Sequence, residues 1–176
     1  MNEELDRVKL LRAGGGVHRY HTARTLRGQT NADHSWGVAM LVLAIEPDAS
    51  ALLLAKALTH DVPEFITGDM PATVKRAEPR MAVLFDELEA QIQLDLDIEY
   101  WVNEHEETLL RWCDTAELIL WCFEEIKLGN TYAKRIALNG LNYLGSFKSP
   151  NERAAILHRQ LSEEATLLTE GVHEYV

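Results

Sequence analysis

Four residues of this chain have the side chains that proteins use to hold a divalent metal ion. They are His34, the adjacent pair His60 and Asp61, and Asp114. Together they offer two nitrogen and two oxygen donors, a set that suits a borderline ion such as zinc, manganese, iron or cobalt. The residues therefore indicate a metal centre, on the condition that the fold brings three distant segments together.

His34 and Asp114 each belong to an expected helix. Apolar residues recur with helical spacing from Val38 to Ile45, and His34 stands at the start of that helix with Asp33 as the expected N-cap. Asp114 lies within residues 109–126, which are apolar on several sides and so predict a central, buried helix. An unpaired carboxylate in such a helix would be costly, so Asp114 needs a partner.

The pair His60 and Asp61 is expected at the end of a helix. An apolar stripe opens at Leu54, and Pro63 disfavours helical geometry at the residue before it and removes a backbone donor. Two adjacent ligands cannot both lie on one face of a regular helix. A helix end is therefore the expected position for this pair.

The same residues also permit a plainer interpretation. A single histidine on a helix is commonly a surface group or a satisfied core group, and His-Asp dipeptides occur by chance. Asp114 has Arg111 and Arg135 as alternative ionic partners. Spacing alone leaves open whether His34 and Asp114 approach His60 and Asp61.

The rest of the chain predicts an all-α domain. No run alternates apolar and polar residues as a strand would. Further helices are expected over residues 81–92, 131–145 and 151–169, and Gly129-Asn130 is expected to end the central helix because both residues tolerate left-handed backbone. Two irregular stretches are expected over residues 14–31 and 62–73, and long loops within a compact helical domain are commonly functional.

Composition limits the classes of protein that this chain can be. Its 176 residues, 47% hydrophobic and 26% charged, fit one globular domain over residues 1–176. The formal net charge of −11 argues against binding a nucleic acid polymer, although a small anionic substrate remains compatible if a metal or local cations offset the acidic background. No stretch reaches the ~18 apolar residues of a membrane span, and the acidic start does not resemble a signal peptide. Cys113 and Cys122 indicate reduced core thiols, and we expect a cytoplasmic protein.

The order of the four candidate ligands resembles that of the HD-domain phosphohydrolases. The chain is similar in particular to their YfbR-type 5'-deoxynucleotidase branch, whose short phage relatives include dATP triphosphohydrolases. If a phage encodes this chain, we expect it in the host cytoplasm. The motifs that carry the resemblance are RYHT at 19–22, DHSWGVA at 33–39, HDVPE at 60–64 and TGDMPATVK at 67–75. The resemblance implies a single HD-domain helical bundle in which His34, His60, Asp61 and Asp114 hold the catalytic metal.

The resemblance also implies roles for residues around the metal. Glu64 would hold or deprotonate the attacking water, and Asp69 would help position the water or the leaving group. Asp69 is in addition a good N-cap for a short helix beginning at Pro71. Arg19 and Lys75 match the phosphate-binding cations of the family.

Tyr20 matches an aromatic residue beside the sugar, which would exclude a ribose 2'-hydroxyl by sterics. Its plainer interpretation is a half-buried loop aromatic.

We therefore expect metal-dependent hydrolysis of a deoxynucleoside triphosphate, dATP first, to deoxynucleoside and triphosphate. Release of phosphate from a deoxynucleoside monophosphate is the alternative. A catalytically silent helical module that binds a nucleotide or a partner chain is the alternative of another class. The ligand set suits zinc, cobalt or manganese, with magnesium also compatible. The apolar helices and four tryptophans, together with the resemblance, predict a homo-oligomer.

Overall fold

The computed structural model describes residues 3–170, which form nine helices and no strand. An isolated bridge pairs His18 with Thr30. The predicted all-α class is therefore confirmed. The helices are α1 (Glu3–Gly14), α2 (Asn31–Ile45), α3 (Ala51–Thr59), α4 (Glu64–Thr67), α5 (Ala72–Ala77), α6 (Pro79–Asp95), α7 (Glu104–Lys127), α8 (Ala133–Leu144) and α9 (Glu152–Glu170).

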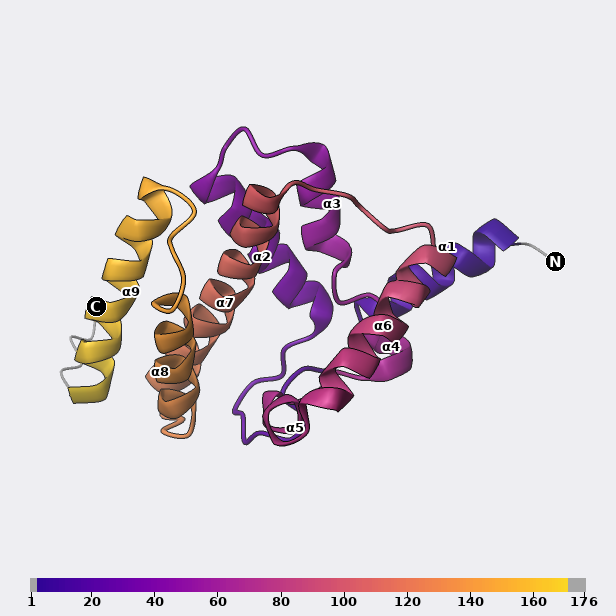
Figure 1. Cartoon of the computed structure of the whole chain (residues 1–176). Coiled ribbons are helices and arrows are strands. Elements are labelled where there is room, and N and C mark those ends of the chain that lie inside the picture. The colour runs from indigo at the N-terminus through magenta and orange to yellow at the C-terminus, as the bar shows by residue number, and fades with distance from the viewer. Residues whose placement is uncertain (1–2, 171–176) are drawn as a thin grey trace.

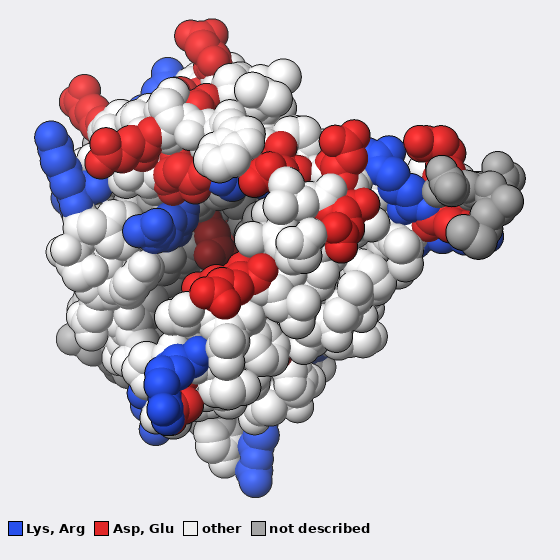
Figure 2. All heavy atoms as spheres, turned by 45° about the vertical axis from the view of Figure 1, so that its right-hand side comes forward, with Lys and Arg blue, Asp and Glu red and all other residues white. Residues whose placement is uncertain are grey.

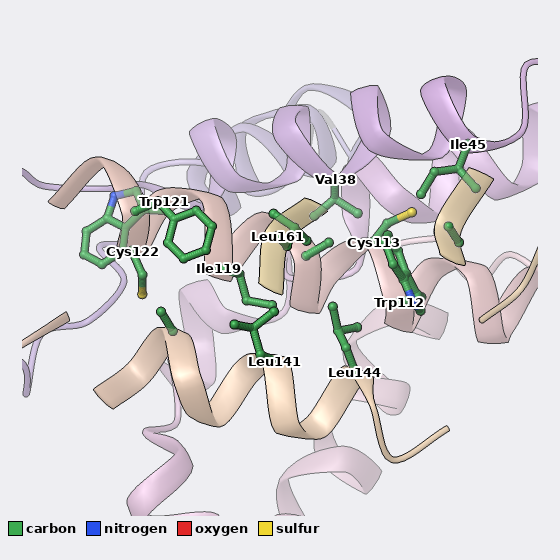
Figure 3. Close-up of a cluster of buried hydrophobic side chains, with 14 of the residues drawn as sticks. Val38, Ile45, Trp112, Cys113, Ile119, Trp121, Cys122, Leu141, Leu144 and Leu161 are labelled. Atoms are coloured by element: carbon green, nitrogen blue, oxygen red, sulfur yellow. The ribbon is translucent and has the colours of Figure 1, made fainter. Parts of the chain in front are cut away.

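The predicted central helix is α7. Figure 1 shows α2, α7, α8 and α9 side by side, and α7 makes contacts with each of the other three. Figure 3 shows their apolar side chains meeting in one cluster, to which α2 contributes Val38 and Ile45 and α8 contributes Leu141 and Leu144. Because α7 is covered on several sides, apolar residues are needed on most of its faces, which explains the pattern seen in its sequence.

Helix α2 begins earlier than the sequence pattern indicates. Its N-cap is Thr30, whose side chain accepts from the backbone N–H of Asp33, while the Asp33 carboxylate accepts from the backbone N–H of Thr30 at 3.0 Å. This is a reciprocal capping box. The expectation that Asp33 is the N-cap was therefore wrong, because Asp33 is the third residue of the helix and closes the cap from inside.

The end of α7 agrees with its predicted stop. The helix ends at Lys127, and Gly129 has a φ of 101°, a left-handed conformation that glycine adopts without strain. Asn130 is buried, and its side-chain amide donates to the backbone oxygen of Arg24 at 2.9 Å. The stop therefore also fixes a distant loop to the end of α7.

A second group of helices lies beside the first and has a much smaller core. Val62, Ile92, Leu96 and Ile98 form this cluster, and Arg7 of α1 donates to the backbone oxygen of Leu96 at 2.7 Å. The expected apolar stripe at residues 81–92 is on α6, but most of it is exposed, with Leu84 57% accessible. The helix was correctly predicted from its spacing, whereas most of its apolar stripe has no covering partner in residues 3–170.

The cysteines and tryptophans have different environments. Cys113 and Cys122 are buried and free, as the prediction of core thiols requires. Trp112 and Trp121 are buried, whereas Trp36 and Trp101 are exposed. Over the described part of the chain, no helix combines the length and the hydropathy needed to cross a bilayer.

Candidate active site

Three of the predicted metal ligands lie together. One donor atom from each of His34, His60 and Asp61 is within 4.8 Å of the others. His34 comes from the first turn of α2, and His60 and Asp61 come from the turn directly after α3. Helix α3 ends directly before this pair, as the position of Pro63 predicts. The turn that follows brings both side chains into the group with His34.

Asp114 lies next to this three-residue group. It comes from α7, and its Oδ1 is 2.9 Å from Nε2 of His34. Burial raises the pKa of Asp114, but the neighbouring His34 and His60 outweigh burial and hold that pKa well below its usual range. The partner of Asp114 is thus the His34 imidazole, and the two arginines considered from sequence do not pair with it among the described residues.

The two imidazoles have the arrangement that metal ligation requires. Nδ1 of His60 lies 2.9 Å from the backbone oxygen of Ala57, and Nδ1 of His34 contacts the carboxylate of Glu117. Nε2 of both rings is buried; that of His34 faces the Asp114 carboxylate, and that of His60 has no hydrogen-bond partner within residues 3–170. An acceptor at Nδ1 holds a proton there, so a cation can bind at Nε2, in His34 by displacing the proton shared with Asp114. The donor set therefore fits a divalent metal.

Arg19 reaches the same place from the loop before α2. Its guanidinium forms an ion pair with the carboxylate of Asp61, and its side chain is 11% accessible. Burial opposes its charge, but the carboxylates of Asp61 and Asp114 outweigh burial and raise the pKa of Arg19. A permanent cation therefore stands beside the candidate metal ligands.

Tyr20 lies next to Arg19 and against α7. Its backbone is left-handed, with a φ of 57°, and its ring stacks on Trp121 with the centroids 4.1 Å apart. The hydroxyl is buried without a hydrogen-bond partner in the described chain. Burial raises the pKa of Tyr20 well above its usual value, so this hydroxyl is protonated.

Glu64 is the first residue of α4 and is held by Asn31. The Asn31 side chain donates to Oε2 of Glu64 at 2.8 Å and to the backbone oxygen of Asp61 at 3.0 Å. Burial and the nearby Asp61 raise the pKa of Glu64 to about 8. A carboxyl group with a pKa near neutrality can accept and return a proton at physiological pH.

Asp69 is turned toward the loop that carries Tyr20. Its Oδ2 accepts the backbone N–H of Tyr20 at 3.1 Å, and His21 Nδ1 lies 4.0 Å away. Helix α5 begins at Ala72 with Pro71 as its N-cap, without a side-chain cap. The expectation that Asp69 caps this helix was therefore wrong, because the carboxylate is already engaged with the Tyr20 backbone.

Lys75 is the one predicted site residue that the structure does not place in contact with the others. It lies on α5, is exposed, and forms neither a hydrogen bond nor an ion pair within residues 3–170. Its predicted role on phosphate remains a prediction.

One stripe of α7 organises the whole site. Asp114, Glu117, Trp121 and Glu125 follow the helical spacing i, i+3, i+7, i+11 and so share a face. Asp114 and Glu117 contact His34, Trp121 stacks on Tyr20, and Glu125 accepts the backbone N–H groups of Leu26 and Arg27 at 2.7 and 3.0 Å. A single helix face therefore fixes both the candidate ligands and the loop.

Sequence reasoning missed Asn31, Glu117 and Glu125, which support this site without being expected ligands. Glu117 and Glu125 carried a usable signal, because they are carboxylates spaced in register with Asp114 along a helix that is apolar on several sides. Asn31 carried no comparable signal. It lies at the first position of α2, and only the fold shows that it faces Glu64.

One face of the molecule combines both charges. The face turned toward the viewer in Figure 2 has a hollow with acidic side chains at its floor and at one edge, and basic side chains at the opposite edge. Local cations therefore accompany the acidic groups, as an acidic protein needs in order to admit an anionic ligand.

Comparison with known proteins decides the family. The sequence profile described as 5'-deoxynucleotidase YfbR-like matches residues 9–155. The chain belongs to this family. It is therefore an HD-type, metal-dependent deoxynucleotide phosphohydrolase and not a catalytically silent helical module.

Relatives in sequence and in structure agree with this membership. The 5'-deoxynucleotidases of Yersinia pestis and Yersinia pseudotuberculosis are 29% identical over 154 residues, covering 72% of this chain and 73% of each relative. The PH0347 protein from Pyrococcus horikoshii OT3 shares the fold with a TM-score of 0.70 at 20% identity, over 93% of this chain and 99% of its own. The cyanophage S-2L HD phosphohydrolase DatZ, solved with dA and one catalytic Zn²⁺ ion, shares it with a TM-score of 0.68 at 22% identity, over 94% and 98% of the two chains.

Proposed function

We propose that this YfbR-like chain hydrolyses a deoxynucleoside triphosphate, with dATP as its first substrate, to deoxynucleoside and triphosphate. The observation that carries the proposal is the convergence of His34, His60, Asp61 and Asp114 beside the buried cation of Arg19. The fold shared with a phage phosphohydrolase bound to dA supports the choice of an adenine deoxynucleotide.

In this proposal His34, His60, Asp61 and Asp114 hold one divalent ion through two imidazole nitrogens and two carboxylates. Zinc, cobalt and manganese fit this set best, and magnesium is also compatible. When bound, such an ion polarises a phosphoryl oxygen and lowers the pKa of a water molecule. The catalytic zinc ion of the cyanophage enzyme supports the choice of zinc, or of an ion with similar ligand preferences, in this chain.

The proton chemistry falls to Glu64. Its carboxylate, held by the Asn31 side chain, would take the proton of the attacking water. Asp69 helps to position the water or the leaving group through the Tyr20 backbone that it holds. Water then attacks the α-phosphorus, the bond to the 5' oxygen breaks, and that oxygen takes up a proton as deoxynucleoside.

Two cations bind the phosphates in this scheme. The Arg19 guanidinium can bind two phosphate oxygens at once, and Lys75 acts as a point charge. Arg19 is paired with Asp61 in the structure, so binding a phosphate would give it a second anionic partner. Lys75 is exposed on α5 and free to reach the outer phosphates.

Tyr20 is the proposed selector for the deoxy sugar. Its ring is fixed against Trp121, so it cannot easily turn aside for a 2'-hydroxyl. We expect Tyr20→Gly to raise kcat/KM for ATP relative to dATP, and glycine is compatible with the left-handed backbone at this position. The ratio of the two rates measures the effect. An unchanged ratio would remove Tyr20 from this role.

Hydrolysis of deoxynucleoside monophosphates is the second candidate. The Yersinia relatives are named 5'-deoxynucleotidases, and they cover most of this chain. The same metal centre and Glu64 would serve either reaction. The two candidates differ in how many phosphates the cations must accommodate.

Phosphorus NMR separates the two candidates directly. The purified protein, supplied with zinc, cobalt or manganese, is offered dATP and dAMP in separate samples. Tripolyphosphate from dATP supports the proposal, whereas orthophosphate from dAMP with dATP untouched identifies a 5'-deoxynucleotidase. The same series with dGTP, dCTP and dTTP reports the base preference, and ATP serves as the ribonucleotide control.

We further propose that residues 1–176 form one domain that assembles with copies of itself. The exposed apolar residues of α6, among them Leu84 and Leu88, support self-association. The two buried free thiols support a reducing, cytoplasmic location. Light scattering on the purified chain would measure the number of copies, and a monomer at all concentrations would contradict the assembly.

A further inference from the structure

Glu117 is a buried carboxylate that the proposed reaction does not use. It lies one turn beyond Asp114 on α7, with its side chain 11% accessible. Oε2 contacts Nδ1 of His34, and Oε1 accepts the side-chain amide of Gln29 at 2.8 Å. Both of its oxygens are therefore engaged by groups that the fold places on either side of it.

The backbone is arranged to admit this carboxylate. Gly37 lies one turn beyond His34 on α2, and a Cβ atom there would lie 2.8 Å from Cγ of Glu117. Such an approach would displace the Glu117 side chain. The absence of a side chain at position 37 is what lets Glu117 reach beneath His34.

The contact determines which nitrogen of His34 faces the candidate ligands. Because Glu117 accepts at Nδ1, the proton on Nδ1 is retained when a cation takes the place of the proton between Nε2 and Asp114. Nε2 is the atom that faces Asp114 and lies 3.7 Å from Oδ2 of Asp61. A ring turned by 180° would lose the Glu117 contact and place the carbon Cε1, which cannot bind a metal, where Nε2 now faces these carboxylates.

We propose that Glu117, held in place by Gln29, is the positioning residue that fixes the orientation and tautomer of His34 for metal binding. The inference rests on the proposed role of His34 as a ligand. It adds a carboxylate–histidine–metal chain to the site, an arrangement in which the outer carboxylate typically contributes a factor of 10 to 100 in metal affinity. In this proposal Glu117 acts through His34 and is not itself a metal ligand.

Cobalt affinity tests the proposal without relying on turnover. The protein is freed of metal with a chelator and titrated with Co²⁺, and binding is followed through the visible absorption of the ion. We expect Glu117→Ala to bind Co²⁺ about 10- to 100-fold more weakly than the unaltered chain. Glu124→Gln, a change at an exposed carboxylate on the same helix, is the matched control and should bind normally.

Glu117→Gln provides the conservative rescue. Its amide oxygen can still accept from Nδ1 of His34, and the Gln29 amide can turn so that its own oxygen, which has no partner in residues 3–170, accepts the new N–H₂ group. We expect Co²⁺ affinity within about threefold of the unaltered chain. Equal losses in Glu117→Gln and Glu117→Ala would overturn the positioning role, because the hydrogen bond would then not be what matters.

The remaining outcomes separate this inference from the proposed function. If the unaltered chain fails to bind Co²⁺, the metal centre itself is wrong. If it binds and Glu117→Ala binds equally well, only the role of Glu117 is overturned. Should Glu117→Ala not fold, Gln29→Ala is the second variant, for which we expect about threefold weaker binding, and unchanged affinity would contradict the proposal.

Discussion

Two regions of this molecule are built differently. Helices α2, α3, α7, α8 and α9 contribute to a large apolar cluster, and this part is called here the main core. Helices α1, α4 and α6 share only a small cluster of Val62, Ile92, Leu96 and Ile98, and these helices, with α5 beside α6, are called here the side region. The candidate active site lies where the two meet. His34 and Asp114 come from the main core, Asp69 and Lys75 come from the side region, and His60 and Asp61 lie in the turn between them.

The difference between the regions matches the demands on their residues. Metal ligands must be held in fixed orientations, and His34 is held by Glu117, which is itself held by Gln29. Lys75 is exposed on a six-residue helix, where a long side chain can follow a substrate. We infer that the main core fixes the chemistry and that the side region supplies adjustable contacts to the nucleotide.

The largest effect is expected at the junction, where Asp61 contacts Arg19, His34 and His60. Asp61→Asn removes a charged ligand, and we expect kcat/KM to fall about 1000-fold together with metal content. Enzyme assays and metal analysis of the purified variant measure both quantities, and circular dichroism checks that the helices persist. Substantial activity in a folded variant would show that the site lies elsewhere.

Glu64→Gln tests the proposed base, which is the first residue of α4 in the side region and lies close to the candidate ligand Asp61. The amide keeps the size of the side chain but cannot take a proton, so kcat should fall about 100-fold while metal binding is retained. Steady-state kinetics and a cobalt titration measure the two properties. A loss of metal affinity equal to that of Asp61→Asn would make Glu64 a ligand, and unchanged kcat would exclude it as the base.

Glu125→Gln tests how firmly the main core holds the loop of Leu26 and Arg27. Burial raises the pKa of Glu125, but the hydrogen bonds from Leu26 and Asn130 outweigh burial and hold that pKa below its usual value. We expect the variant to lose about 1–3 kcal/mol in free energy of unfolding at pH 7. Urea denaturation measures it, and Glu163→Gln, at an exposed carboxylate of α9, is the control.

The same variant has an expected pH signature. Because the pKa of Glu125 is lower in the folded than in the unfolded state, its contribution is present above its ordinary value of 4.5 and is lost as the pH falls through the folded-state value. The difference in unfolding free energy between the unaltered chain and Glu125→Gln should therefore shrink in acid. A difference that stays constant would show that the carboxylate charge does not hold the loop.

The smallest effect is expected from Lys75→Ala in the side region. An exposed cation typically contributes under about 1 kcal/mol, so KM should rise a few-fold with kcat unchanged. Its neighbour on α5 supplies the control, because Arg76→Ala should leave both constants unchanged. An effect of Lys75→Ala as large as that of Glu64→Gln would erase the proposed distinction between fixed and adjustable contacts.

Much of the helical framework could be predicted from the sequence, but its boundaries and exposures could not. Apolar spacing located α2, α6 and α7, and Gly129 marked the end of α7 because left-handed backbone costs glycine little. Thr30 was missed as the N-cap of α2, since Asp33 is an equally good cap by residue type. The apolar stripe of α6 looked like a core face, and only packing shows that it is largely exposed.

The sequence by itself determined which chemistry this protein carries, because His34, His60, Asp61 and Asp114 are metal-binding residue types and their surrounding motifs resemble those of one family. It also determined the helical class, since local spacing encodes helices directly. The tertiary structure alone decided that Asp114 faces His34, that Glu117 lies behind it, and that Asp69 holds the Tyr20 backbone. These contacts join residues 49 to 83 positions apart, and no local pattern encodes a pairing that arises only when helices pack.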